Sequence, residues 1–199
     1  MTRMPCALLV VVVGLPAAAC LRTPENPPPS CDDQVCTVES GDALLTVVNA
    51  TDQDFWTHLD LETASVVDTD TPQDDGTWDL GFRRMVVKSN SGVNGGGGVL
   101  VCVLDDTDFD DVTAAPATCN WRTDAEGRPD PRDPGGTVMN DDPWYDYDLV
   151  DHTLTAKPRR VYVVETGDGT FVKVHFEDYY SSEGVAGWPS FVWSTIPGF

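Results

Sequence analysis

The sequence predicts an all-β domain of mostly antiparallel sheets, a sandwich or open barrel that carries one long, irregular, acidic loop. Short runs rich in Val, Thr and aromatic residues recur from residue 43 to the end of the chain, and turn residues bound them. No stretch long enough for an ordinary helix shows a clean apolar repeat of about 3.6 residues. Together these two observations indicate strands that are joined by turns.

Residues 1–19 have the features of a signal peptide. Arg3 precedes an apolar stretch, residues 7–15, that is too short to span a bilayer as a helix. Small residues then lead into Cys20, a pattern that resembles a bacterial lipoprotein cleavage site. We therefore expect Cys20 to become the lipidated first residue, and the protein to contact the membrane through that lipid. An ordinary signal peptide cut near Ala19 is the alternative.

Residues 20–40 are expected to form a tether and a disulfide-bonded lead-in, and residues 41–199 the β domain. The tether prediction rests on residues 21–30, which contain four prolines and little apolar matter. The remaining 180 or so residues of an exported chain are enough for one ordinary domain with a real core.

Four cysteines remain after Cys20, and an even number in an exported chain predicts two disulfides. Three connectivities exist, and the pairs Cys31–Cys36 and Cys102–Cys119 are favoured because each closes a local loop. In the loop-entropy description the second bond contributes about 3 kcal/mol to stability. A zinc site is the rival interpretation, which the spacings fit poorly because no histidine lies at a finger-like distance.

The expected strands alternate or form short apolar runs between turn residues. They cover residues 43–48, 55–61, 65–68, 77–82, 85–88, 99–104, 161–166, 170–176 and 191–196. The clearest unit is the hairpin around the turn Gly167-Asp168-Gly169. In its second strand Val172, Val174 and Phe176 share a core face, and we expect the opposite face to be largely solvated. That opposite face consists of Phe171, Lys173, His175 and Glu177.

Residues 105–143 form the long acidic loop, with ten aspartates and five prolines. Loops of this length tend to be functional or disordered. The alternating carboxylates of Asp106, Asp108 and Asp110 suggest a calcium site, since calcium takes oxygen ligands. The run lacks the glycine and distal glutamate of an EF-hand loop, so a solvated acidic loop is the alternative.

Charge and motifs exclude several function classes. The formal net charge of −21 disfavours nucleic acid and anionic lipid as partners. No Gly-x-Ser-x-Gly elbow is present. The run Gly95 to Gly98 lacks the Lys-Ser/Thr pair of a phosphate loop and opens no helix. We therefore expect a binding protein and not an enzyme.

Several segments in this order resemble the HmuY-like family of heme-binding bacterial lipoproteins. They are residues 55–63, residues 78–84 with Asn90-Ser91-Gly92 and the glycines that follow, residues 161–180, and residues 191–194. The resemblance implies a HmuY-like β domain, lipid-anchored at the outer membrane or cell surface of a Gram-negative bacterium. It further implies that the protein holds heme between loops for iron uptake, with heme, a heme-carrying protein or an outer-membrane receptor as partners.

The family's axial ligands do not transfer. The resemblance implies one histidine from the loop of residues 105–143 and one from the strand at residues 144–150, and neither segment holds a histidine here. His152 and Met139 are therefore the candidate iron ligands, since thioether ligation of heme iron is chemically sound. Candidate pocket walls are the flat aromatics Trp144, Tyr145 and Tyr147. Bases that could pair with the propionates are Arg83, Arg84, Lys88, Arg122, Arg128 and Arg132.

Two functions follow from these observations. The first is a surface-anchored lipoprotein that binds heme. The alternative is a non-heme interaction or structural lipoprotein that uses the same fold and is stabilised by cations. The missing axial histidines support the alternative, and a hemin titration separates the two.

Overall fold

The computed structural model describes residues 28–125 and 136–199. The expected signal peptide, Cys20, Arg128 and Arg132 lie outside these ranges. Within them, no helix has the length and apolar character needed to cross a bilayer.

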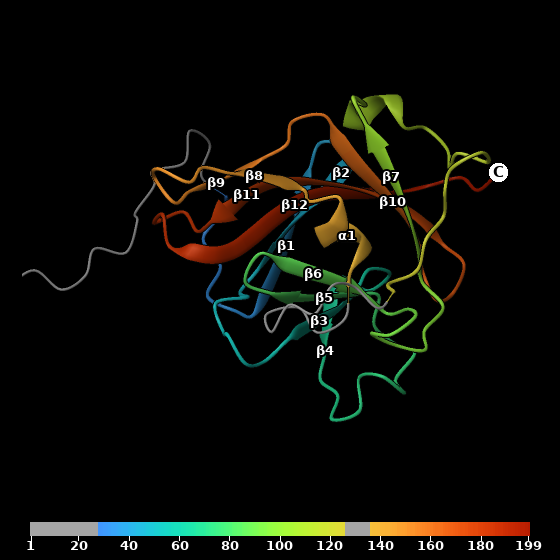
Figure 1. Cartoon of the computed structure of the whole chain (residues 1–199), viewed down its shortest axis with the longest axis horizontal. Helices are drawn as coiled ribbons and strands as arrows, with labels where there is room; N and C mark the ends of the chain where they lie inside the picture. The colour runs from blue at the N-terminus through green and yellow to red at the C-terminus, as the bar shows by residue number, and fades with distance from the viewer. Residues whose placement is uncertain (1–27, 126–135) are drawn as a thin grey trace, which may run out of the picture.

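The described residues form three antiparallel sheets (Figure 1). The largest has six strands in the order β1 (Val35–Ser40), β2 (Ala43–Val48), β12 (Ala186–Ile196), β11 (Phe171–Tyr180), β10 (Arg160–Glu165) and β7 (Leu100–Asp105). The second has the order β4 (Ser65–Val67), β3 (Thr57–Asp60), β5 (Leu80–Arg83) and β6 (Val86–Ser89). The third pairs β8 (Tyr145–Tyr147) with β9 (Leu154–Ala156).

Helical structure among the described residues is limited to two single turns, η1 (Phe109–Asp111) and α1 (Val138–Asp141). The described strands form no closed barrel, because the first and last strands of each sheet do not pair with each other. The predicted all-β, antiparallel fold class is therefore confirmed.

Strand β1 comes from the last part of the expected lead-in. Its pairing with β2 runs from Val35↔Val48 to Ser40↔Ala43. No core pattern marks this strand in the sequence, because its side chains are half-buried or exposed. The nine predicted runs each contain a strand, and β1, β8, β9 and the first half of β12 are additions to them.

The main core lies between the six-stranded and four-stranded sheets. In Figure 1 strands β3 to β6 lie below β10, β11 and β12, and α1 lies between the two groups. Rings from both sheets meet in this core: Phe82 of β5 stacks on Phe191 of β12, with centroids 5.6 Å apart and an interplanar angle of 7°. Burial of this apolar surface is the dominant stabilising term for such a sandwich.

The outer face of β11 is covered, so the prediction that it would be largely solvated is wrong. A second apolar cluster unites Val161 and Val163 of β10 with Val112 and Ala115 from the acidic loop. Lys173 is only 8% exposed, and its Nζ donates to the Phe109 carbonyl at 2.9 Å. The first part of the loop thus folds back over the sheet.

Both expected disulfides are present. Cys31–Cys36 and Cys102–Cys119 join Cα atoms 5.7 and 6.0 Å apart. The second bond ties the acidic loop to β7, and Val112 and Ala115 of that loop pack on the outer face of the sheet.

Candidate functional site

The segment after β6 is organised by a buried asparagine. Asn90 is fully buried, and its Nδ2 donates to the carbonyls of Asp75 and Trp78, both at 2.8 Å. Its Oδ1 accepts from the Gly97 amide at 3.0 Å. A Cβ atom on Gly95 would lie 1.9 Å from that same Oδ1. The glycine run therefore wraps a structural side chain and does not form a ligand site.

A buried carboxylate joins this segment to the far end of the acidic loop. Asp124 is 2% exposed, and its oxygens accept from the amides of Ser89 at 2.7 Å and Val138 at 2.9 Å. Its own amide donates to Ser91 Oγ at 3.0 Å. Burial raises the pKa of Asp124 above its ordinary value. Because Val138 opens α1, Asp124 fixes where that helical turn sits.

Met139 lies inside the core, where the structure gives its sulfur no exposed face for a porphyrin. The residue is 1% exposed and belongs to the main apolar cluster. The N-cap Thr137, whose Oγ1 accepts from the Asn140 amide, and the Asp124 bond to Val138 hold this turn against the core. Its expected role as an iron ligand therefore disagrees with the described packing.

Trp144 is likewise a core residue and not a pocket wall. It is 1% exposed and stacks on Phe176 with ring centroids 4.6 Å apart. Its indole N–H donates to the Met85 carbonyl at 3.1 Å, which satisfies the only polar atom of the side chain. Tyr145 packs edge-on against it and is half-buried.

The β8–β9 hairpin carries the predicted residues that do reach the surface. Tyr147 is 45% exposed, and His152 is exposed in the turn with a positive φ of 55°. The Tyr147 hydroxyl and His152 Nδ1 form a hydrogen bond of 2.8 Å. The structure thus brings together two residues that the sequence assigned to different roles, and leaves Met139 apart from them.

The tip of this hairpin presents apolar side chains to solvent. Leu149 is 78% exposed and Val150 is 85% exposed. Asp148 holds the turn, because its Oδ1 accepts from the amides of Val150 at 2.7 Å and Asp151 at 3.1 Å. Two adjacent aliphatic residues that a structured turn directs outward favour contact with an apolar ligand or partner.

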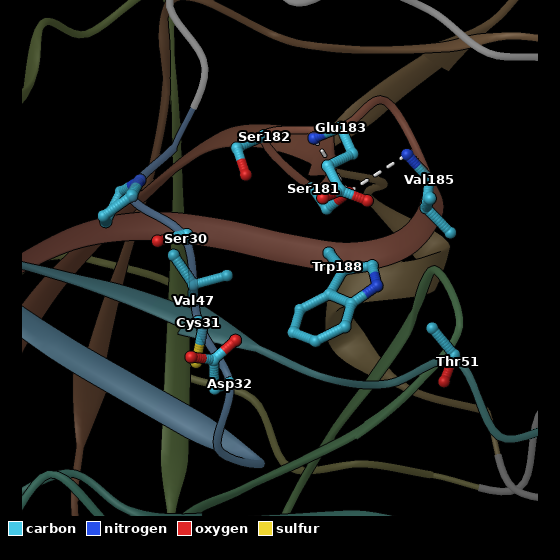
Figure 2. Close-up of a pocket in the computed structure, with 11 residues that line it drawn as sticks. Ser30, Cys31, Asp32, Val47, Thr51, Ser181, Ser182, Glu183, Val185 and Trp188 are labelled. Atoms are coloured by element: carbon cyan, nitrogen blue, oxygen red, sulfur yellow. Dashed lines mark hydrogen bonds between the residues drawn. The ribbon is translucent and has the colours of Figure 1, made fainter.

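A hollow of about 380 Å³ lies elsewhere, between residues 29–32 and the turn that joins β11 to β12 (Figure 2). Trp188 and Val185 contribute its apolar surface. None of the residues predicted to ligate or enclose heme lines it.

A single arginine contacts two of the three predicted calcium residues. Asp108 forms an ion pair with Arg159 at 2.7 Å, and the same guanidinium donates to the Asp106 carbonyl. Asp110 lies in η1 and belongs to no group of three potential metal ligands among the described residues. Positive charge therefore already faces this run, which makes it a poor cation site.

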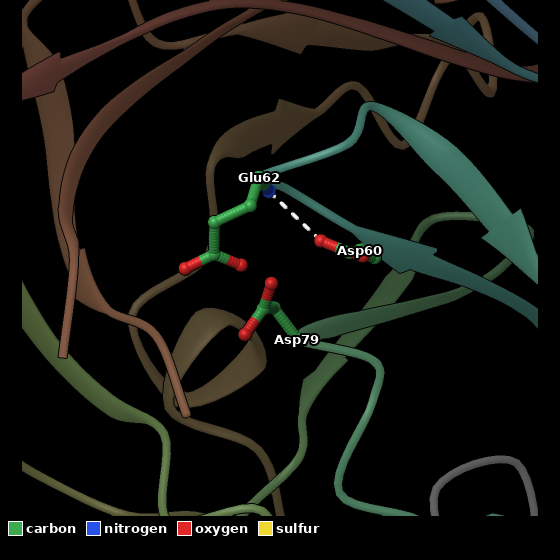
Figure 3. A group of neighbouring side chains, drawn as sticks. All are labelled: Asp60, Glu62 and Asp79. Carbon is green, nitrogen blue, oxygen red and sulfur yellow. Dashed lines mark hydrogen bonds between the residues drawn. The ribbon is translucent and has the colours of Figure 1, made fainter. Parts of the chain in front are cut away.

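Another acidic group is the only set of three metal-type ligands that gathers within the described ranges. Carboxylate oxygens of Asp60, Glu62 and Asp79 lie within 4.8 Å of one another (Figure 3). Asp79 accepts from the amides of Leu61 at 2.9 Å and Gly167 at 3.3 Å. Through these bonds Asp79, which precedes β5, connects the end of β3 to the β10–β11 turn, so the group has a structural role.

Asp79 should make stability fall as the pH rises from about 4 to about 6. Burial, aided by the nearby Glu62 charge, raises its pKa from 3.8 to about 6. The folded state holds this proton more tightly than the unfolded state, so the contribution is complete at low pH and is lost as the pH passes the folded pKa. Urea unfolding of Asp79→Asn should show a gain over wild type that grows across this window to about 3 kcal/mol.

Asp168→Asn, which alters an exposed carboxylate in the neighbouring turn, is the control for that series. If the free energies of unfolding of Asp79→Asn and wild type kept a constant difference between pH 4 and 6, Asp79 would not carry the raised pKa.

The bases expected to serve heme propionates are largely used within the fold. Lys88 is 7% exposed, and its Nζ lies 4.6 Å from the centre of the Trp56 ring and 4.8 Å from that of Trp78. Burial lowers its pKa to about 8. Arg84 donates to the carbonyl of Ala186 at 3.2 Å, and Arg122 pairs with Asp142 at 2.5 Å.

A family model described as HmuY protein matches residues 52–193. The chain belongs to the HmuY family. The match covers the four-stranded sheet, the acidic loop, the β8–β9 hairpin and most of the larger sheet. A search of curated proteins finds no match.

Solved HmuY-like structures share the fold at low sequence identity. The apo HmuY analog of Tannerella forsythia is 17% identical, with a TM-score of 0.59 over 83% of this chain and 98% of its own. A Bacteroides vulgatus protein named as HmuY-like is 22% identical, with a TM-score of 0.53 over 76% of this chain and 91% of its own. Apo PinO of "Porphyromonas gingivitis" is 18% identical, with a TM-score of 0.55 over 82% and 98%.

Proposed function

We propose that this HmuY-family protein binds heme at the β8–β9 hairpin, as a lipid-anchored protein of the bacterial surface that takes part in heme acquisition. Membership of the family and a structural neighbour named as a HmuY-like heme binding protein support heme as the ligand. The hairpin is favoured as the site because it alone combines candidate ligand atoms with exposed apolar side chains among the predicted residues.

The Tyr147–His152 pair is the observation that carries this proposal. A tyrosine oxygen is a known heme-iron ligand. His152 Nδ1 lies 2.8 Å from that oxygen, and this hydrogen bond would orient the oxygen toward a bound iron. Leu149 and Val150 would cover apolar parts of the macrocycle. Bound heme would supply the iron, and these residues would hold and shield it.

A hemin titration followed by absorbance tests the site. We expect a Soret shift with wild-type protein. Tyr147→Phe should weaken binding and change the ligand-field bands, because it removes the oxygen ligand. His152→Ala should weaken binding by about 10- to 100-fold and keep the tyrosinate spectrum, as the loss of a supporting hydrogen bond does at metal sites.

Tyr145→Phe is the matched control, since it removes a hydroxyl from the same strand at a half-buried position. It should leave the titration unchanged. The absence of any Soret shift at micromolar protein, in both oxidation states of the iron, would contradict the heme proposal. A spectrum that changes with His152→Ala and is indifferent to Tyr147→Phe would make histidine the ligand.

A non-heme interaction lipoprotein of the same fold is the second candidate. The burial of Met139 and the exposed pair Leu149 and Val150 favour it, because an outward apolar tip also suits a protein partner. A negative hemin titration with an intact fold would select this function.

A further inference from the structure

The hollow beside Trp188 is built from two segments that are each held firmly. On one side the Cys31–Cys36 disulfide closes the chain around Asp32. On the other, Ser181 Oγ accepts from the amides of Glu183 at 3.2 Å and Val185 at 3.1 Å, which fixes the β11–β12 turn. Figure 2 shows the Trp188 indole between these two walls. The volume of the hollow, about 380 Å³, is in the range of small-molecule sites, about 300–1,000 Å³.

Trp188 offers this hollow a flat, unoccupied surface. The side chain is half-buried. Within the described ranges its ring has no aromatic or cationic neighbour, and its indole N–H has no acceptor, unlike the N–H groups of Trp78, Trp144 and Trp193. An indole that is partly enclosed and lacks an internal acceptor has both an apolar face and a donor available for a ligand.

The polar groups of the lining select the class of ligand. Asp32 and Glu183 supply carboxylates, and no lysine or arginine lines the hollow. Neither carboxylate takes part in an ion pair or side-chain hydrogen bond with another described residue. The hydroxyls of Ser30 and Ser182 are likewise without partners in the described part of the chain. Such a lining repels anions and is too polar for a purely apolar ligand.

We propose that this hollow binds a neutral saccharide. A sugar ring has an apolar C–H face that can lie on the Trp188 indole, and hydroxyls at its edge. Hydroxyls that donate to Asp32 and Glu183 would make charge-assisted bonds, which are stronger than neutral ones. The serine hydroxyls and the indole N–H would complete the contacts. The hollow is separate from the β8–β9 hairpin, so the saccharide proposal does not depend on heme binding.

The test follows indole N–H resonances of ¹⁵N-labelled protein in the presence of glucose, galactose, N-acetylglucosamine, maltotriose, lactose and chitotriose. The chain has six tryptophans, and Trp188→Phe assigns the relevant signal. We expect at least one sugar to shift the Trp188 resonance in a saturable way. Trp188→Ala should lower that affinity at least tenfold.

Glu183→Gln is the second variant, since the residue is exposed and its exchange leaves the packing alone. It should lower the affinity severalfold. Two control variants should leave it unchanged: Trp56→Phe, which alters a half-buried tryptophan just before β3, and Tyr147→Phe. No shift with any of the sugars, a shift that persists in Trp188→Ala, or a shift caused only by calcium chloride would overturn the proposal.

Discussion

Replacing Asn90 with alanine is expected to lower the free energy of unfolding by about 3–5 kcal/mol. The side chain is fully buried and makes three hydrogen bonds to the backbone. Its removal leaves two carbonyls and one amide without partners, of which the Trp78 carbonyl is buried and the other two groups are partly buried. A buried unsatisfied group costs about 1–3 kcal/mol, and the cavity left by the side chain adds to the loss. Urea unfolding monitored by tryptophan fluorescence measures the loss.

Asn94→Ala is the control, because Asn94 lies in the same loop and is half-buried with one side-chain bond, to Asp124. It should cost about 1 kcal/mol. Gly95→Ala should be as damaging as Asn90→Ala, since the new Cβ would displace Asn90 Oδ1. Because both changes break one arrangement, the double variant should cost clearly less than the sum of the two. Full additivity would show that Asn90 and the glycine run act separately.

Replacing Asp124 with alanine should be comparably costly and should also free the segment that leads to the hairpin. The change removes acceptors from the amides of Ser89 and Val138 and from the Asn94 side chain. A loss of about 3–5 kcal/mol is expected from unsatisfied buried donors. Hydrogen exchange should accelerate at the amides of Ser89 and Val138 well before global unfolding.

Asp141→Asn provides the comparison for Asp124→Ala, since it removes an exposed carboxylate from α1 itself. It should leave both the exchange rates and the stability near wild type. If Asp124→Ala were to change the rates no more than Asp141→Asn does, Asp124 would not be the residue that positions α1.

Local patterns predicted most of the sheet positions and few of the site contacts. The runs of β2, β10 and β11 are visible because burial alternates along strands or persists through them. Strand β1 was not predicted, because its half-buried or exposed side chains show no such alternation. Short β8 and β9 lie in polar sequence, and only a strand at residues 144–150, which contains β8, was expected, from the resemblance to the family.

The roles of the site residues depended on contacts distant in sequence. Asp124 holds α1 against the core, so Met139 is buried, yet nothing near Met139 in the sequence indicates this. The Tyr147–His152 contact needs the positive φ of His152, which no residue type predicts reliably. The outer face of β11 is covered by a loop that the Cys102–Cys119 bond ties to β7; the bond was predicted, and the packing of the loop on the sheet was not.

The Cys31–Cys36 bond also has a mechanical consequence. A pull on the N-terminal side of the domain would pass from Cys31 through the sulfur atoms directly to Cys36, which is already the second residue of β1. Residues 32–35, and with them the terminal pair Val35↔Val48, would therefore carry no tension. The first backbone pair to feel the load would be Cys36↔Val47, where Val47 is buried at 1% exposure. Tension applied on the N-terminal side of Cys31 would thus enter the sheet at the pair that contains the buried Val47 and not at the terminal pair of β1 and β2.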